Sequence, residues 1–272
     1  MIELLEYTFF WHAVVGCVLT GIVCGLIGTY VVSRRMVFIA GGLAHASLGG
    51  VGVCALFGWS PLLGASLFGL LAACGVYGLS RHREVRGDSA IAMLWAFGMS
   101  LGIICLFLSP KYLPSLSSYL FGNILYATNE DLSFIAIVTA VVICFFALRL
   151  PQIVAISFDT TFARSSRLRV GIFEQVMLLL TALCIVASLR TVGIVMVIAL
   201  MSVPQAVASL YMGSFRGVAL GSVAVGVVSC LSGLWASYVL NIPSGPAIIM
   251  VCIAIYAIAR AIKIFSARLN KI

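Results

Sequence analysis

Long apolar runs separated by short polar segments make up almost the whole of this 272-residue chain. Each run holds close to the ~20 residues that a helix needs to cross the hydrocarbon core of a membrane. The pattern predicts helical spans over 11–32, 36–57, 62–79, 89–108, 132–148, 172–189, 194–212, 217–240 and 247–264. A short interfacial helix is expected over 119–125, before the fifth span. If the first run is only a re-entrant piece, the number of crossings is eight rather than nine.

Composition indicates an all-α integral membrane protein, a polytopic bundle of about eight to nine transmembrane helices. Hydrophobic residues make up 63% of the chain and charged residues only 9%, whereas a soluble domain has roughly 25% charged residues. Apolar runs of this length are typical of membrane helices rather than of barrel strands. Residues 1–272 are therefore predicted to form a single transmembrane domain. The nine cysteines stand singly inside apolar runs, where cysteine behaves as a small hydrophobic residue rather than a metal ligand.

The distribution of basic residues predicts how the spans are oriented. The chain has a formal net charge of +8. With nine crossings, and with the polar segment 149–174 in the cytoplasm, every Lys and Arg except Lys111 and Arg190 falls on the cytoplasmic side. Cytoplasmic loops of membrane proteins carry this kind of excess. The rule accounts for the positive charge without a nucleic-acid partner.

The polar segment 149–174 interrupts the apolar pattern most strongly, with four arginines, an aspartate and a glutamate. That much charge is costly in hydrocarbon, so the segment is expected to be a loop in water. Its centre is predicted to be a short helix capped by Ser157 or Asp159, with Phe158 and Phe162 four apart on one face. Such a helix suits docking into a groove of a partner protein. The alternative is an ordinary basic loop that contains one helical turn.

Two residues inside the predicted spans are candidates for a functional role. His45 is an ionisable residue at membrane depth, and imidazole is a common ligand of divalent transition metals. The alternative is a histidine that is hydrogen-bonded to a neighbouring helix. Pro204 interrupts the seventh span and frees backbone carbonyls there. It either shapes a pathway or is a tolerated membrane proline.

Catalytic motifs are missing from the sequence. It contains no serine–histidine–acid arrangement, no H-E-x-x-H motif and no P-loop. An intramembrane enzyme would need a catalytic pair at membrane depth, and His45 has no acidic or cysteine partner near it in sequence. The chain is therefore predicted not to be an enzyme, and not to bind ATP through the usual phosphate-binding loop.

Six stretches, in their order along the chain, together resemble the membrane permease subunits of metal-uptake ABC transporters of the zinc, manganese and iron type. They are SRRMVFIAGGLAHASLGG, GDSAIAMLWAFGMSLGII, SYLFGNIL, SFDTTFA, TVGIVMVIALMSVPQA and IPSGPAIIM. The resemblance implies an ABC importer permease in the bacterial inner (cytoplasmic) membrane. It also implies three partners: cytoplasmic ABC ATPase subunits, an external metal-binding protein and a second copy of the chain in a homodimer. No permanently bound cofactor is expected, only the transported divalent ion.

The resemblance also implies a role for a cytoplasmic coupling segment over 155–170. Its contacts with the ATPase would be made by Phe158, Asp159, Phe162 and Ala163. Thr161 stands where the family commonly has an acidic residue, and Arg167 where it commonly has glycine. These departures are expected to change the match to a particular ATPase rather than to abolish docking.

In the pathway, the resemblance implies that His45 is a transient metal ligand. Gly41 and Pro204 are the candidates for shaping the pathway itself. Family members that hold the metal there have an acidic residue four positions before the histidine, on the same helical face. Here that residue is Gly41, so a second ligand is missing. A second copy of His45 across a homodimer axis could supply another nitrogen.

The sequence leaves alternative functions open. The second candidate is the permease of an importer for a metal chelate, such as a siderophore or haem, although such permeases tend to be longer. A structural scaffold would not need a cytoplasmic helix with aromatic residues. Zinc, manganese and iron share ligand types, so the sequence does not decide between them.

Overall fold

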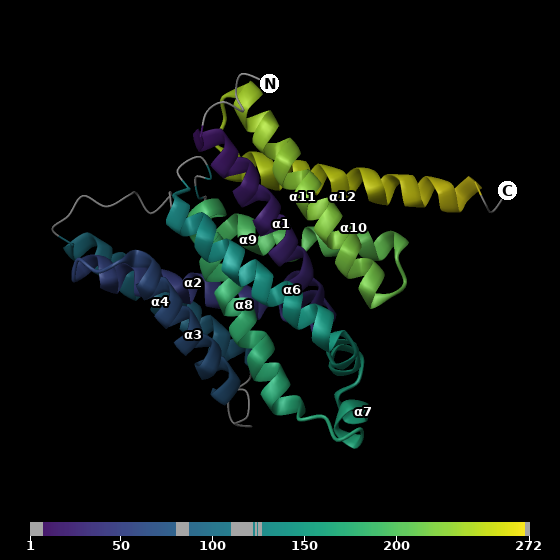
Figure 1. The fold of residues 1–272 in the computed structure, drawn as a ribbon, viewed down its shortest axis with the longest axis horizontal. Helices are drawn as coiled ribbons and strands as arrows, with labels where there is room; N and C mark the ends of the chain where they lie inside the picture. Colours follow the sequence, from purple (N-terminus) through teal and green to yellow (C-terminus); the bar gives the residue numbers. More distant parts are fainter. Residues whose placement is uncertain (1–7, 80–86, 110–121, 123, 125–126, 270–272) are drawn as a thin grey trace.

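The computed structural model describes residues 8–79, 87–109, 122, 124 and 127–269, and this part of the chain is helical throughout apart from turns (Figure 1). Nine helical segments within it are long and apolar enough to cross a membrane. The predicted all-α polytopic bundle is confirmed. The seventh segment is broken into two helices, and a further short helix lies between the fifth and sixth.

The helices occur in the order that the apolar runs predict. Their bounds are α1 Thr8–Ser33, α2 Val37–Leu56, α3 Pro61–Leu79, α4 Gly87–Leu108, α6 Asn129–Phe158, α7 Thr160–Ser165, α8 Val170–Val192, α9 Ile194–Leu200, α10 Val203–Tyr211, α11 Phe215–Leu240 and α12 Ser244–Leu269. The interfacial helix predicted over 119–125 lies outside the described residues, except for Gly122 and Ile124.

Helix α2 lies at the centre of one part of the bundle, in contact with α3, α4 and α8. Of the residues in its apolar stretch 78% are buried, against 11% for α12. Small residues allow this packing: a Cβ atom on Gly50 would lie 2.0 Å from the carbonyl oxygen of Gly64 on α3. Without a hydrophobic force between helices in lipid, such close approach supplies the packing energy. The glycine-rich second span therefore packs as its composition indicates.

The rest of the bundle is built around α1. It packs between α6 and α11, and α11 packs in turn on α12, as Figure 1 shows. Helix α12 begins against α11 and α10 and then extends away from the bundle towards the C-terminus. Its C-terminal half is largely exposed.

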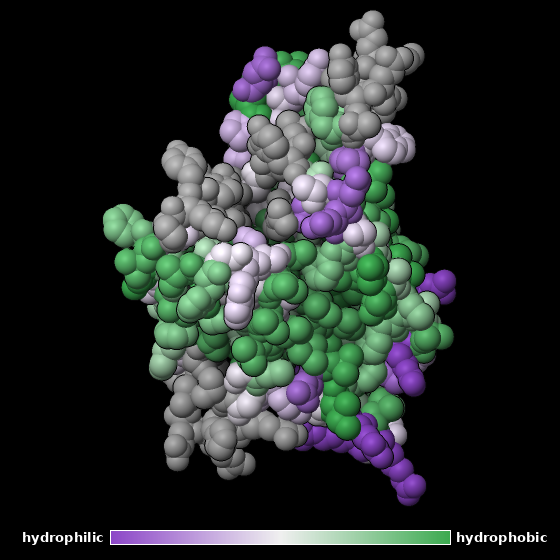
Figure 2. All heavy atoms as spheres, turned by 60° about the vertical axis from the view of Figure 1, so that its left-hand side comes forward, coloured by the Kyte–Doolittle hydropathy of each residue, from purple (hydrophilic) through white to green (hydrophobic). Residues whose placement is uncertain are grey.

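The outer surface of the bundle matches a membrane environment. Large apolar side chains such as Phe107, Leu71 and Ile137 are exposed, the first of them by 89%. Figure 2 shows that apolar residues form a continuous belt across one face, with hydrophilic residues gathered above and below it. A soluble monomer rarely exposes so large an apolar area, so the belt marks the part of the surface that faces lipid.

The fifth span is longer than predicted. Helix α6 does not end at Leu148 but continues to Phe158, so the polar segment 149–174 is not a loop from its first residue. The predicted boundary coincides instead with a kink, since Arg149 has non-helical angles (φ −120°, ψ 15°) and Pro151 follows it. Proline lacks an N–H and its ring disturbs the preceding turn. The helix resumes because Ile153 is fully buried beyond the kink and packs into the main core.

Candidate functional site

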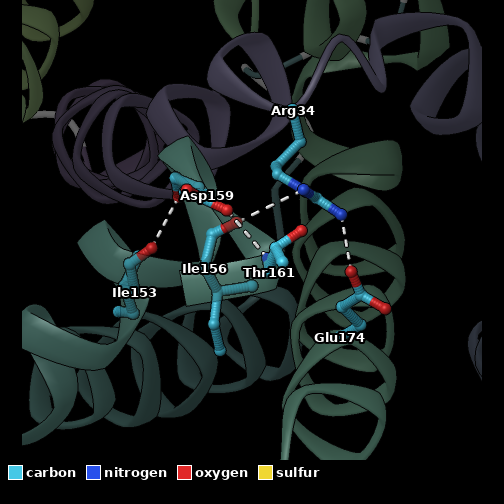
Figure 3. A network of polar contacts seen from close by, with 7 residues as sticks. Arg34, Ile153, Ile156, Asp159, Thr161 and Glu174 are labelled. Carbon is cyan, nitrogen blue, oxygen red and sulfur yellow. Dashed lines mark hydrogen bonds and ion pairs between the residues drawn. The ribbon is translucent and has the colours of Figure 1, made fainter. Parts of the chain in front are cut away.

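A sharp turn at Asp159 joins α6 to α7 at the polar end of the bundle (Figure 3). Asp159 is extended (φ −145°, ψ 100°), and its Oδ1 accepts hydrogen bonds from the backbone N–H groups of Thr161 at 2.8 Å and Phe162 at 3.0 Å. These bonds satisfy two of the donors that a helix start leaves unpaired. Of the two predicted caps, Asp159 is right and Ser157 is wrong, because the Ser157 hydroxyl donates to the Ile153 carbonyl instead.

The end of α7 is closed by an equally specific arrangement. The N–H of Leu168 donates to the carbonyl of Ala163 at 3.1 Å, and the N–H of Arg167 to that of Arg164 at 3.0 Å. This is the hydrogen-bond pattern of a Schellman motif, which needs a left-handed residue after the helix. Arg167 takes that conformation, with φ 58°. The position where the sequence has arginine in place of the common glycine is thus one that favours glycine.

Two aromatic rings project from this turn. Phe158 is 71% exposed and Phe162 is 61% exposed. The prediction that they share one face of one helix is wrong, because Phe158 ends α6, Phe162 belongs to α7, and extended Asp159 separates the two helices. One side of the Phe158 ring lies edge-on to Phe215, with centroids 6.4 Å apart. Two helix ends, rather than one helix face, present these rings.

Ala163, the fourth residue expected at this surface, is fully buried. It is the buried residue of α7 and packs in a small apolar cluster with Ile156 of α6 and Val170 of α8. This cluster fixes α7 to the ends of α6 and α8. The exposed residues of the four are Phe158, Asp159 and Phe162, so Ala163 supports the surface from below.

Arg34 makes contacts that the sequence did not reveal, although it belongs to one of the six family-like stretches. From the end of α1 it donates through Nη1 to the Ile156 carbonyl at 3.3 Å and through Nη2 to the Glu174 carboxylate at 2.5 Å (Figure 3). The guanidinium therefore joins α1 to the last turns of α6 and to the start of α8. Its place after an apolar span and in a family-like stretch does not indicate a partner 140 residues away.

His45 lies on α2 and is 8% exposed. Its ring stacks on the Trp95 indole of α4, with centroids 4.3 Å apart and an angle of 11° between the planes. Its buried Nδ1 has no hydrogen-bond partner among the residues that the structure describes. A neutral imidazole with an unpaired ring nitrogen can accept a hydrogen bond or bind a metal ion through its lone pair.

Gly41 lies one turn before His45 and also beside Trp95. A Cβ atom there would meet Ile198 Cδ1 at 3.7 Å and Trp95 Cζ3 at 3.8 Å. These are ordinary contact distances, so a methyl group fits. A longer side chain would have to share the space with Ile198 or with the indole that stacks on His45. Gly41 and His45 therefore both face the Trp95 side chain of α4.

The seventh span is interrupted as predicted, but the break lies at Met201 and Ser202, before Pro204. Helix α9 ends at Leu200 and α10 starts at Val203, with Pro204 in its first turn, where proline needs no N–H partner. Gln205 holds the break in place: its buried Nε2 donates to the Cys24 carbonyl of α1 at 3.0 Å. The sequence placed Gln205 next to the proline but gave no indication of this contact.

Clusters of metal-ligating side chains are not found elsewhere in the described residues. No group of three or more His, Cys, Asp or Glu side chains is placed there to hold a metal ion. The structure does not bring His45 together with Pro204 or with the exposed rings of Phe158 and Phe162 in one site. Apart from Pro204, the candidate residues lie in two places, the buried surroundings of His45 and the exposed turn at Asp159.

The nine apolar spans found in the described residues form a bundle with the architecture of an ABC permease. The chain belongs to the ABC 3 transport family, whose sequence model matches residues 6–263. It is thus a membrane permease subunit of the metal ABC transporter type, the family that the sequence resembled.

Individual relatives agree with this assignment. The chain is 37% identical over 263 residues to an uncharacterized membrane protein of Synechocystis. The aligned region covers 97% of this chain and 94% of that protein. It is 32% identical over 256 residues to the manganese transport system membrane protein MntC of Listeria monocytogenes, covering 94% and 91% of the two chains. The solved structure of PsaBC from Streptococcus pneumoniae in complex with Fab matches with a TM-score of 0.86 and 27% identity, over 95% of each chain.

Proposed function

We propose that this chain forms the translocation pathway of an ATP-driven importer of a divalent transition-metal ion, and that manganese is the ion to test first. Family membership and the manganese-transport names of relatives such as MntC support the proposal. Those names favour an ion over a metal chelate as the substrate. A buried imidazole with a free lone pair suits zinc, manganese or iron, and the transported ion would be bound only in passing.

The observation that carries the proposal is the pair of exposed rings at the polar end, Phe158 and Phe162. Full burial of a phenylalanine side chain is worth about 1.5–3 kcal/mol, and these rings lie on a turn fixed by Asp159 and Arg34. Such a surface suits a groove on an ABC ATPase. We expect ATP binding to bring two ATPase subunits together and to move this turn with them.

The turn is connected to the spans in a way that would transmit this movement. Arg34 links it to α1, and the cluster around Ala163 links it to α6 and α8. Movement of the turn would therefore displace three helices together and open the pathway to one side at a time. This is alternating access, in which rigid groups of helices rock around the transported ion.

In the pathway, His45 would supply one nitrogen to the passing ion. A second copy of the chain would place another His45 across the dimer axis, and an external metal-binding protein would deliver the ion. One or two imidazole ligands bind a divalent ion less firmly than a closed four-ligand site. Weak binding is suitable for a carrier, because the ion must also be released.

Uptake in cells that lack this chain tests the function. Restoring the chain should restore energy-dependent manganese uptake, with zinc and iron measured in parallel. A tagged copy should co-purify with a P-loop ATPase, and the double substitution Phe158→Ala and Phe162→Ala should lose both the ATPase and the uptake. Phe107→Ala, at an exposed ring of the apolar belt, is the matched control and should retain both. Unchanged uptake of all three metals without the chain would refute the proposal.

A further inference from the structure

A cavity of about 790 Å³ lies between the ends of α1 and α3 and the starts of α2 and α8. It is next to α7 and so to the turn at Asp159 that joins α6 to α7, which we call the coupling turn. Three arginines line it: Arg34 from the end of α1, Arg164 from α7 and Arg169 directly before α8. The acidic residue in the lining is Glu174, which is already paired with Arg34. The lining therefore keeps an excess of positive charge that no acidic side chain in it balances.

The first turn of α8 adds backbone donors to the same cavity. Gly171 and Ile172 belong to the lining, as does Val170, whose own N–H already donates to the Leu168 carbonyl at 2.9 Å. The first N–H groups of a helix have no partner within the helix, and together they carry a partial positive charge. Here Arg169 provides no side-chain cap and the first turn contains no acidic residue. This helix start is therefore electrostatically suited to an anion.

Tyr30 gives independent support for a ligand. Its side chain is 1% exposed and lines the cavity, and no residue that the structure describes accepts a hydrogen bond from its hydroxyl. The charged groups near it are Arg34, which can only donate hydrogen bonds, and Glu174, whose carboxylate is paired with Arg34. The Tyr30 proton is thus left without an acceptor. A buried polar group without a partner is unfavourable, and an oxygen-rich anion in the cavity would satisfy it.

We propose that this cavity binds a phosphate-bearing anion. Its oxygens would accept hydrogen bonds from the Tyr30 hydroxyl and from the first turn of α8, and its charge would lie against Arg164 and Arg169. The anion would be either the headgroup of an anionic phospholipid or a free phosphate compound, because both present the same oxygens. It would hold α7 against the bundle beside the Arg34–Glu174 pair, and so influence the coupling turn without contacting the metal pathway.

The test uses the full-length chain purified in a phosphate-free detergent that also lacks phospholipid. Binding of inorganic phosphate is measured by calorimetry, and binding of dioctanoyl phosphatidylglycerol by native mass spectrometry. Arg169→Gln should weaken binding of the active probe at least tenfold, and Tyr30→Phe by about tenfold, since each removes a donor to a charged group. Arg167→Gln, an exposed arginine of the same segment that is not part of the lining, is the matched control and should bind as the parent does.

Each result has a defined meaning. Binding of phosphatidylglycerol alone assigns the site to a lipid headgroup, and binding of inorganic phosphate assigns it to a free phosphate compound. Binding of neither probe, or equal weakening by Arg167→Gln and Arg169→Gln, overturns the proposal. Arg164→Gln provides a second test from α7 if Arg169→Gln does not fold. Because these readouts do not involve metal uptake, the site and the transport function can fail independently.

Discussion

Arg34 and Glu174 form a 2.5 Å ion pair between the end of α1 and the start of α8, although they are 140 residues apart in the chain. The same guanidinium donates to the Ile156 carbonyl in the last turn of α6. One side chain therefore joins α1 to two helices that lie more than 120 residues further along the chain, next to the turn that carries Phe158 and Phe162. A contact of this kind is where movement of the turn would reach the spans.

Replacing Arg34 tests that connection. Arg34→Ala should reduce metal uptake more than it reduces assembly with the ATPase, because the turn remains but its link to α1 is lost. Only about a quarter of each side chain of the pair is exposed, so the stability cost should exceed the roughly 1 kcal/mol of a solvent-exposed pair. Thermal unfolding and uptake are measured together. Arg35→Gln, at the exposed neighbouring arginine, is the control. Uptake that falls only in proportion to lost ATPase would contradict this role.

The cap at Asp159 predicts a contrast between two substitutions. Asp159→Ala removes the acceptor for the N–H groups of Thr161 and Phe162 and should destabilise α7 by about 1 kcal/mol. Asp159→Asn keeps a side-chain oxygen and should retain most of the cap. Hydrogen exchange at Thr161 and Phe162 measures the difference directly. Equal exchange in both variants would mean that the buried cluster beneath α7, and not the cap, holds the helix.

The left-handed conformation of Arg167, with φ 58°, predicts an order of stabilities. Arg167→Gly removes a backbone penalty of roughly 1–2 kcal/mol but adds entropy to the unfolded chain, so the protein should gain about 0.5 kcal/mol. A β-branched residue tolerates this conformation poorly, so Arg167→Val should be less stable than the parent. Thermal unfolding in detergent ranks the three proteins. A valine variant as stable as the glycine variant would show that the backbone is not left-handed there.

The contact of Gly50 with α3 predicts a large effect from one methyl group. A Cβ atom on Gly50 would lie 2.0 Å from the Gly64 carbonyl oxygen, so Gly50→Ala has to push α2 and α3 apart. Overpacking of this kind typically costs 1–3 kcal/mol. Gly78→Ala is the control, because nothing lies within 4 Å of its Cβ position, and it should be neutral or slightly stabilising. Thermal unfolding of both variants decides whether the two helices are as close as described.

Substitution of His45 tests its proposed role as a ligand. His45→Ala removes the imidazole and should lower metal uptake at equal expression of the chain. Trp95→Phe keeps an aromatic surface beside His45 and should preserve most of the uptake. Metal uptake across a concentration range separates weaker capture from slower turnover. Unchanged uptake in His45→Ala would remove the residue from the pathway.

The resemblance of six stretches identified the family correctly, and the apolar runs predicted the order of the spans, because membrane crossing imposes a length and composition that one segment satisfies by itself. Where the pattern failed, the competing influence came from elsewhere in the chain. Arg149 and Pro151 read locally as the end of a span, yet the helix resumes because Ile153 is buried against other helices. The same local reading placed Phe158 and Phe162 on one helix, whereas Asp159 divides them between two.

The sequence by itself determined that the chain is a helical membrane permease, which helices it forms and which residues stand at its polar end. Only the tertiary structure decided which distant groups meet: Arg34 with Glu174, His45 with Trp95, and Gln205 with the Cys24 carbonyl. Hydrophobicity is a property of each segment and can be read along the chain. A contact between helices depends on how each helix is rotated and displaced against its neighbours, and that is decided by the packing of the whole bundle.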